Sequence, residues 1–348
     1  MKILIMRLDR IGDVLLSTPV IEALRGAYPQ SRIAMMVRPQ ARAIVEGNPY
    51  LDEFIIYDKG GAHSSPWQTL KFALALRKKN FDIALILHPT NRSHAIAFLA
   101  GIPKRVGWNA KCGFLLTDKL LDERHRGVMH ESDYALEIVR LLGVKIGQRP
   151  PLYFPVSAQD EKTIGNFLSL VGIRGDDNLI AIHPGASCPS KVWPPKRFAE
   201  VADKLAAEFK AKIVILSGAD DVRLCDQMQK SMKTQAISLA GKTSLGELGA
   251  LLKRCRLFIS NDSGPVHLAV ALKTPVIAIF GRKQTGLSPR RWKPLGEEDV
   301  YLHKDVGCLE CRAHNCERGF KCLSAITPAE VLSAARGILN AKRTEINV

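Results

Sequence analysis

Two turns centred on aspartate, one near each end of the chain, carry the residue types best suited to chemistry. The first is 9–13 (Asp-Arg-Ile-Gly-Asp) and the second is 261–267 (Asn-Asp-Ser-Gly-Pro-Val-His), and each follows an apolar run of strand type. Carboxylates and backbone N–H groups then lie at the carboxyl ends of parallel strands, where open α/β sheets bind ligands. Two such turns predict two facing domains with a reaction between them.

Asp13 follows Gly12 at the predicted start of a helix. Capping is the commoner role of a lone aspartate in that place, for Asp13 or for Asp9. As a general base, Asp13 would instead take a proton from a nucleophilic hydroxyl. A helix N-terminus favours the carboxylate and weakens it as a base, so a catalytic Asp13 needs partial desolvation or a well-oriented acceptor.

The loop 183–194, between a predicted strand and a predicted helix, holds groups that suit a phosphate. Gly185 permits close approach of a ligand, Ser187 can donate a hydrogen bond and Lys191 can neutralise the anion. An ordinary connecting loop with a solvated lysine fits these residues equally well.

The helix start at the second turn also suits a diphosphate, to which Ser263 adds a hydroxyl. A diphosphate would repel Asp262, so this carboxylate meets neutral hydroxyls or orients Lys191. The alternative is an Asx-turn with a helix cap, with His267 as a structural histidine. A third strand-end turn, 218–221, ends in two aspartates that could bind a ribose diol or cap a helix.

Four of the eight cysteines cluster near the C-terminal end, with two, four and five residues between them: Cys308, Cys311, Cys316 and Cys322. Zinc or an iron–sulfur cluster could be held by thiolates at such a spacing. The intervals match no standard zinc finger, and a reducing cytoplasm tolerates free thiols. We favour a structural loop, with a structural metal left open, over a redox centre.

Apolar periodicity predicts alternating strands and helices, which imply parallel, doubly wound sheets. The first part has predicted strands at 2–7, 32–37, 53–57, 82–87 and 105–107 and helices at 13–27, 41–48, 67–79 and 94–100. A proline-rich linker at 148–160 precedes strands at 179–183, 212–217, 254–260 and 275–280 and helices at 195–208, 264–272 and 328–341. The predicted domains are 1–155 and 156–326, with a C-terminal segment at 327–348.

Composition is ordinary for a globular protein, with 46% hydrophobic and 24% charged residues, but the formal net charge is +16 and is spread over both halves. Such a field attracts polyanions, including anionic lipid, phosphorylated glycans and nucleic acid. We read neither a membrane span nor a signal peptide and therefore expect a cytoplasmic protein. A dinucleotide-binding Gly-x-Gly-x-x-Gly after the first strand and a P-loop motif are both lacking, which argues against a standard dehydrogenase and a P-loop NTPase.

Together these motifs resemble those of the ADP-heptose:lipopolysaccharide heptosyltransferases of glycosyltransferase family 9, and the resemblance covers nearly the whole chain. The segments that carry it are 7–15 (Arg-Leu-Asp-Arg-Ile-Gly-Asp-Val-Leu) with Thr18-Pro19, 101–108, 183–187 with Lys191 and Trp193-Pro194, and 261–269. Each piece alone is weak, and their combination and order are specific.

The resemblance implies a GT-B architecture, in which two Rossmann-like domains face each other across a cleft and a C-terminal helix packs back toward the first domain. It implies inverting transfer of L-glycero-D-manno-heptose from ADP-heptose to the lipopolysaccharide inner core, without a metal or other cofactor for catalysis. The implied partners are ADP-heptose, an inner-core acceptor and, through peripheral contact, the anionic inner membrane. A nucleic-acid partner is not expected.

Carried over by position, Asp13 is the base on the acceptor hydroxyl, Lys191 and Ser187 hold the donor diphosphate, and Asp262 contacts the donor heptose. With Ser263, the predicted donor site further contains Gly264, Pro265 and His267 for the diphosphate and nucleoside, Thr243 for adenine and Asp221 for ribose. Ala186 stands where some members have a hydroxyl residue. The role of the cysteine segment does not carry over.

Basic residues of the first domain could meet an acceptor that bears carboxylates and phosphates: Arg77, Lys78, Lys79, Arg92, Lys104, Arg105, Lys111, Arg124 and Arg126. Three alternatives stay open. They are a GT-B transferase that uses another nucleotide sugar, such as a UDP-sugar; a non-catalytic protein that binds nucleotides or anionic lipid; and a metal-dependent or redox protein centred on the cysteines.

Overall fold

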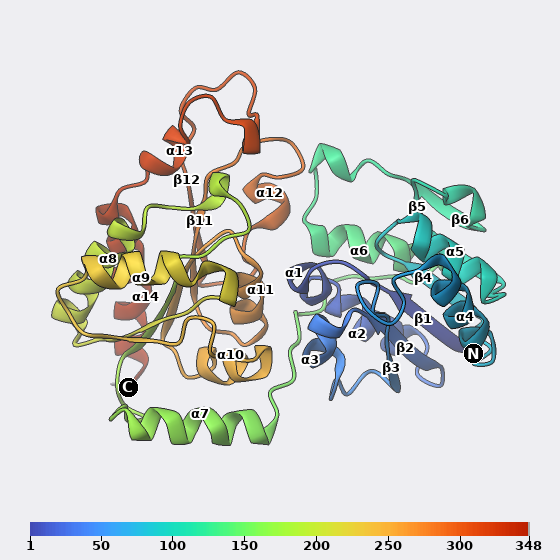
Figure 1. Ribbon diagram of the computed structural model, residues 1–348, viewed down its shortest axis with the longest axis horizontal. Coiled ribbons are helices and arrows are strands. Elements are labelled where there is room, and N and C mark those ends of the chain that lie inside the picture. Colours follow the sequence, from blue (N-terminus) through green and yellow to red (C-terminus); the bar gives the residue numbers. More distant parts are fainter. Residues whose placement is uncertain (347–348) are drawn as a thin grey trace. The chain divides into compact units, whose positions relative to one another are not determined.

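The computed structural model describes residues 1–346, with side chains described as far as Ala341, and the chain forms two compact α/β units (Figure 1). The boundary along the chain lies between Pro155 and Val156. It falls inside the predicted linker 148–160, whose last residues already belong to a helix.

The first unit is a six-stranded sheet of order β3-β2-β1-β4-β5-β6, in which every pairing is parallel. Its strands are β1 (Lys2–Met6), β2 (Arg32–Val37), β3 (Glu53–Ile56), β4 (Ile83–Ile86), β5 (Lys104–Asn109) and β6 (Asp118–Leu121). Its helices are α1 (Ile11–Leu15), α2 (Thr18–Ala27), α3 (Arg42–Val45), α4 (Pro66–Arg77), α5 (Asn91–Leu99) and α6 (Glu131–Arg140), with 3-10 turns η1 (Pro39–Ala41), η2 (Gly113–Leu115) and η3 (Arg124–Arg126).

The second unit repeats this plan with the order β12-β11-β10-β7-β8-β9, again with every pairing parallel. Its strands are β7 (Leu179–His183), β8 (Lys212–Ile215), β9 (Ala236–Ser238), β10 (Leu257–Asn261), β11 (Val276–Phe280) and β12 (Val300–His303). Its helices are α7 (Ala158–Leu170), α8 (Pro195–Phe209), α9 (Val222–Ser231), α10 (Leu245–Leu252), α11 (Gly264–Ala271), α12 (Pro289–Trp292), α13 (Lys321–Ser324) and α14 (Pro328–Ile346), with 3-10 turns η4 (Pro189–Lys191), η5 (Ala219–Asp221) and η6 (Ala313–Asn315).

The strand order reverses beside the first strand of each sheet, because β1 lies between β2 and β4, and β7 lies between β8 and β10. Connections on the two sides of such a point leave in opposite directions and open a crevice at the carboxyl ends of the strands. The turn 9–13 follows β1, and the turn 261–267 begins at the end of β10. Each aspartate turn therefore lies at the switch point of its own sheet.

The last helix belongs to the core of the second unit. Leu332 and Ala335 of α14 pack in one hydrophobic cluster with Phe198 and Leu205 of α8. Indole Nε1 of the buried Trp193 donates a hydrogen bond to the carbonyl oxygen of Ile326, at 3.0 Å, just before α14 begins. These contacts fix α14 to the second unit, and its predicted packing toward the first stays a prediction.

Several boundaries differ from those predicted. The predicted helix 13–27 is two helices, because α1 ends at Leu15 and α2 begins at Thr18. Pro19, in the first turn of α2, has no N–H with which to continue the hydrogen bonding of α1. The prediction missed several elements: helices α6, α7, α9, α10, α12 and α13, and strands β6, β9 and β12. Across the described residues, the structure has no helix that combines the length and the apolar character needed to span a membrane.

Candidate functional site

A buried arginine organises the switch point of the first unit. Arg7 is the first residue after β1, and its side chain is only 2% exposed. Its guanidinium donates from Nε to Oδ1 of Asp9 at 2.9 Å, and from one terminal nitrogen to Oδ1 of Asp13 at 3.1 Å and Oε1 of Glu131 at 2.9 Å. It also reaches the carbonyl oxygen of Leu87, after β4. One cation thus holds three carboxylates that come from different elements.

Asp13 lies inside α1, not before it. The N-cap position is Arg10, and no side chain caps the helix there. The carboxylate of Asp13 is 17% exposed and is oriented by Arg7. The capping role considered for Asp13 is therefore wrong, and its partial burial meets one of the two alternative conditions for a base at a helix start, namely partial desolvation.

Burial dominates the electrostatics of this cluster. It raises the pKa of Asp9 to about 7, against the opposing charge of Arg7 and with repulsion from Asp13 and Glu131. It lowers the pKa of His88 to about 4, and the cations Arg7, Lys59 and Arg124 act in the same direction. His88 Nδ1 lies 3.9 Å from Oδ2 of Asp9. At neutral pH the site therefore combines a neutral imidazole with a carboxyl group close to its titration point.

The interpretation of the sequence missed Arg7 and Glu131 as members of the site. Glu131 is the first residue of α6 and lies 124 positions from Arg7 along the chain. The sequence did contain a signal for these two residues. Arg7 directly follows a buried strand and Glu131 begins an amphipathic helix, and a charged residue in such a place needs an opposite charge because unpaired ions are rarely buried.

In the second unit, Asp262 is held between two cations. Its Oδ2 lies 3.0 Å from Nζ of Lys191 and 2.9 Å from a terminal nitrogen of Arg282. Arg282, which follows β11, was not predicted; its side chain is 6% exposed, and its Nε is buried without a hydrogen-bond partner. The predicted alternative in which Asp262 orients Lys191 is the arrangement found.

Asn261 fastens the loop after β7 to the end of β10. Its Oδ1 accepts a hydrogen bond from the backbone N–H of Trp193, and its Nδ2 donates to the carbonyl oxygen of Pro184. Asn261 and Trp193 are both fully buried. The backbone around Lys191 is therefore positioned by residues on either side of it, and a rigid loop presents the lysine to Asp262.

The start of α11 has the residues predicted for a phosphate site. Ser263 is its N-cap residue, and its hydroxyl is not engaged in capping but lies 2.9 Å from Oγ of Ser260. Gly264 and Pro265 form the first turn and are half-buried, and His267 lies buried in the next. Asp262 directly precedes the cap, so it acts through its ion pairs and not as a helix cap.

Three other predicted donor residues lie on neighbouring loops. Asp221, at the N-cap of α9, packs against Gly185, where an added Cβ would lie 2.4 Å from its Oδ2. Burial, followed by the charge of Asp220, raises the pKa of Asp221. Ser187 is exposed on the loop after β7, and Thr243 is half-buried just before α10. The loops after β7 and β8 thus touch directly at Gly185.

The four clustered cysteines line one pocket of about 400 Å³, together with Arg282 and His303. All four thiols are free, and Sγ of Cys322 donates to the carbonyl oxygen of Gly281 at 2.6 Å. Among the side chains that the structure describes, no group of three or more His, Cys, Asp or Glu residues is arranged to hold a metal ion. The thiols share a pocket but do not form the metal cage that their spacing left open.

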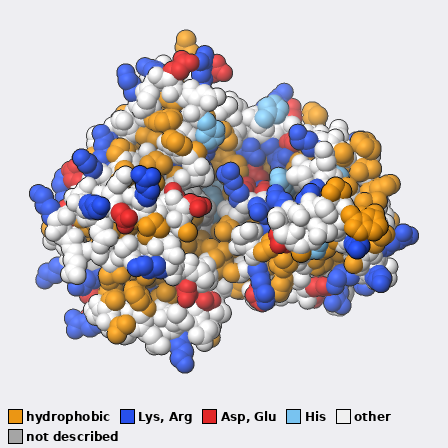
Figure 2. Space-filling model, viewed as in Figure 1, with side chains coloured by type: hydrophobic (Ala, Val, Ile, Leu, Met, Phe, Trp, Pro, Cys, Tyr) orange, Lys and Arg blue, Asp and Glu red, His pale blue; other side chains and the backbone are white. Residues whose placement is uncertain are grey.

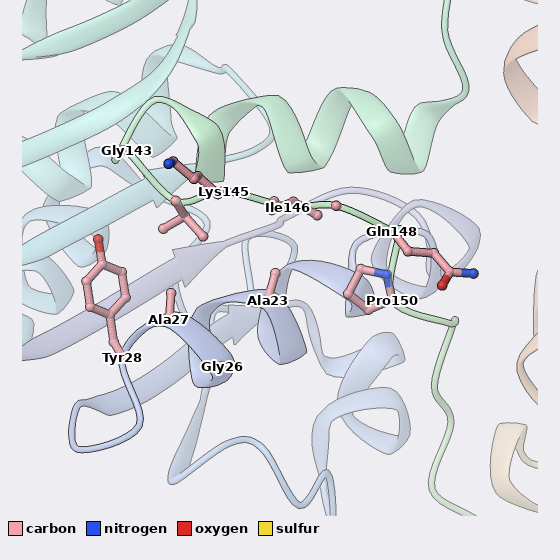
Figure 3. A pocket seen from close by; sticks show the side chains of 11 residues that line it. Ala23, Gly26, Ala27, Tyr28, Gly143, Lys145, Ile146, Gln148 and Pro150 are labelled. Atoms are coloured by element: carbon pink, nitrogen blue, oxygen red, sulfur yellow. The ribbon is translucent and has the colours of Figure 1, made fainter.

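A second pocket, of about 530 Å³, lies in the first unit away from the strand ends. Figure 3 shows Ala27 and Tyr28, at the end of α2, on one wall and Lys145 and Ile146, from the segment after α6, on the other. Lys145 is the one charged residue among those that line it. Compared with the two switch points, this pocket has few side chains that could take part in a reaction.

The model of glycosyltransferase family 9 (heptosyltransferase) matches residues 69–321. Lipopolysaccharide heptosyltransferase 2 of Escherichia coli strain K12 is 28% identical in sequence to this chain, over 97% of this chain and 99% of that protein. A glycosyl transferase of family 9 from Veillonella parvula superposes with a TM-score of 0.88 at 29% identity, covering 98% of this chain and 97% of the other.

The solved ADP-heptose lps heptosyltransferase II of E. coli superposes with a TM-score of 0.81 at 24% identity, over 99% of this chain and all of that one. The two parallel six-stranded units are those of the GT-B fold, which confirms the predicted fold class.

Proposed function

Because this chain belongs to glycosyltransferase family 9 and is a heptosyltransferase-family enzyme, we propose that it transfers L-glycero-D-manno-heptose from ADP-heptose to a hydroxyl of the lipopolysaccharide inner core. We place the reaction in the cytoplasm, with inversion at the anomeric carbon and no cofactor. The proposal goes beyond family membership in its donor, its acceptor and the roles of its residues.

One observation carries the proposal: an oriented, partly buried carboxylate stands at one switch point, and a cation pair around a carboxylate stands at the other. Asp13 is held by Arg7 at 3.1 Å, and Asp262 is held by Lys191 and Arg282 at 3.0 and 2.9 Å. Glycosyl transfer needs a base for the attacking hydroxyl and positive charge for the departing diphosphate. The two clusters supply these two requirements separately.

We assign the base to Asp13. Its carboxylate accepts the proton of the acceptor hydroxyl as that oxygen attacks the anomeric carbon of the heptose and the bond to ADP breaks. The hydrogen bond from Arg7 fixes the carboxylate without burying it completely, which leaves one face for the acceptor. A positioned base of this kind contributes about 10²–10⁴-fold to a rate.

We assign the leaving group to the second unit. Lys191 and the N-terminus of α11 balance the charge that develops on ADP, with Ser187 and Ser263 as hydroxyl donors. Asp262 then meets the hydroxyls of the heptose while Arg282 keeps its charge compensated. Gly264, Pro265 and His267 line the diphosphate and nucleoside, Asp221 binds the ribose and Thr243 lines the adenine.

The test is a transfer assay with ADP-heptose and a panel of truncated core acceptors, read by mass spectrometry of the product. We expect one heptose to be added to an inner-core acceptor. Calorimetry should show that ADP-heptose binds and that UDP-sugars do not. Tight binding and transfer of a UDP-sugar would instead establish the alternative GT-B donor.

Asp13→Ala tests the assignment of the base. We expect transfer to fall at least about 100-fold while donor binding by calorimetry stays within about twofold. Asp118→Asn, a carboxylate on β6 outside the cluster, is the matched control and should transfer normally. Normal transfer by Asp13→Ala would mean that another group is the base, whereas no transfer by the parent chain would leave a non-catalytic binding protein as the explanation.

A further inference from the structure

The outer face of α4 and α5 exposes large apolar side chains that a soluble surface rarely leaves in water. Trp67 is 62% exposed and Leu74 48% on α4, Phe98 is 49% exposed at the end of α5, and Phe114 is 75% exposed on η2. Figure 2 shows hydrophobic side chains gathered on the right, over α4 and α5. We call the exposed face of α4, α5 and η2 the α4–α5 surface.

Helix α4 presents this face as a regular stripe. Trp67, Lys71, Leu74 and Lys78 follow one another at intervals of four, three and four residues, which places them on one side of a helix. The opposite side, with Ala73 and Leu76, is buried in the core of the first unit. The outward stripe of α4 therefore alternates large exposed apolar side chains with lysines, the mixture typical of a helix that lies at a membrane surface.

The surface is continuous across its three elements. Helices α4 and α5 pack against each other, and η2 packs on α5. The side chain of Arg77, the last residue of α4, reaches the segment just after α5, where a Cβ added to Gly101 would lie 3.4 Å from its Nε. The guanidinium of Arg105 stands 5.5 Å from the centre of the Phe98 ring and donates to the carbonyl oxygen of Leu115 in η2.

The segment of chain that forms this surface is almost free of carboxylates, although Glu53 of β3 pairs with Lys79. Between Asp58 and Asp118 the chain has a single carboxylate, Asp82, which lies at the start of β4 and accepts from the backbone N–H of Lys2. The same stretch contains nine basic residues: Lys59, Lys71, Arg77, Lys78, Lys79, Arg92, Lys104, Arg105 and Lys111. Lys71 stands 5.4 Å from the Trp67 ring, so cation and aromatic ring share one site.

We propose that the α4–α5 surface docks on a bilayer with anionic headgroups. Aromatic and aliphatic side chains enter the boundary between headgroups and acyl chains, while flanking Lys and Arg side chains extend to the phosphates. Nucleic acid would match the charge but would not bury leucines such as Leu74. An acidic protein would pair with the cations, but a protein interface rarely places lysine along its apolar centre.

Docking through this surface would place the proposed reaction at a membrane, but the docking itself does not depend on the proposed function. Docking would hold the enzyme at the membrane in which a lipid-linked acceptor resides, with the reacting residues elsewhere on the molecule. Vesicle binding needs neither donor nor acceptor. A failure of docking and a failure of heptosyl transfer are therefore separate results.

The experiment measures binding of the full chain to vesicles of phosphatidylcholine with about one quarter phosphatidylglycerol, and to vesicles of phosphatidylcholine alone. We expect binding to the anionic vesicles, weakening as salt rises, with a blue shift of fluorescence that disappears in Trp67→Phe. Lys71→Glu and Trp67→Ser/Phe98→Ser should each weaken partitioning at least about tenfold. Transfer to a soluble, deacylated acceptor should be unchanged in both.

Matched controls come from the second unit. Lys230→Glu changes the net charge by the same amount as Lys71→Glu at an exposed site, and Leu170→Ser removes an apolar side chain that is 86% exposed. Both should bind vesicles like the parent. The proposal is overturned if the parent ignores anionic vesicles, if the α4–α5 variants bind as well as the controls do, or if a nucleic acid or an acidic protein is bound in place of vesicles.

Discussion

Removing one charge from the Arg7 cluster should stabilise the protein, and only at high pH. The perturbation is Asp9→Asn. Burial raises the pKa of Asp9 from 3.8 to about 7, so the folded protein holds this proton more tightly than the unfolded chain does. Stability therefore falls as pH rises from about 4 to about 7 and is level above that. Asparagine does not ionise, so the Asp9→Asn variant should not lose stability over this pH range.

The magnitude follows from the two pKa values. The rise in the pKa of Asp9 from 3.8 to about 7 lowers the free energy of unfolding by at most about 4 kcal/mol once Asp9 is ionised in both the folded and the unfolded state. Asparagine keeps an oxygen to accept from Nε of Arg7, which now bonds Oδ1 of Asp9 at 2.9 Å. The carboxylates of Asp13 and Glu131 still compensate the guanidinium. We expect a gain of about 2–4 kcal/mol near pH 8 and less than about 1 kcal/mol near pH 4.

Hydrogen exchange of the β1 amides, read by mass spectrometry across this pH range, reports the opening free energy of the first unit separately from the second. Asp118→Asn controls for the loss of one carboxylate outside the cluster. An Asp9→Asn protein that is less stable than the parent near pH 8, or whose difference from the parent is the same at both ends of the range, would refute the reasoning.

Three further predictions concern the second unit. Lys191→Met removes a cation 3.0 Å from Asp262, and we expect kcat to fall about 10²–10³-fold at saturating donor in initial-rate measurements, with partial recovery in Lys191→Arg. Gly185→Ala places a Cβ 2.4 Å from Oδ2 of Asp221, so the donor Kd measured by calorimetry should rise about tenfold or more, whereas Gly175→Ala, in open space, should leave it unchanged. Cys308→Ser/Cys311→Ser should keep transfer within about twofold, because no metal cage links these thiols in the described residues; a larger loss with release of bound metal would contradict this.

The fold class could be predicted from local pattern. Apolar runs such as 3–6 and 257–259 are long enough for buried strands, and the helix-periodic segments after them force parallel, doubly wound sheets. Elements without a clean pattern were missed. Strand β6 (Asp118–Leu121) alternates partly buried and exposed residues at a sheet edge, and α10 (Leu245–Leu252) is apolar all round. The sequence of β6, Asp-Lys-Leu-Leu, does not alternate polar and apolar residues, and α10 has only one charged residue, so neither shows a periodic contrast along the chain. The amphipathic helices α6 and α9 do have such a contrast and were missed as well.

The candidate site was predictable where its residues share a turn with a strand end. Asp13, Lys191 and Asp262 each lie within a few residues of a strand that the sequence marks clearly. The contacts exclude only the capping alternative: Asp13 is inside α1 and Asp262 pairs with Lys191, so neither is a cap. A capping residue and a catalytic one share the same local sequence, because both stand at a helix start.

By itself, the sequence determined two Rossmann-like units and the turns that carry their polar residues, because strand, turn and helix signals are local. Only the tertiary structure decided what those residues touch. Arg7 meets Glu131 across 124 positions, and Arg282 meets Asp262 across 20, because strand order and helix packing bring their segments together. The spacing of these residues along the chain does not predict that they form ion pairs. A buried charge is tolerated only where the fold places an opposite charge beside it, and that placement depends on tertiary structure.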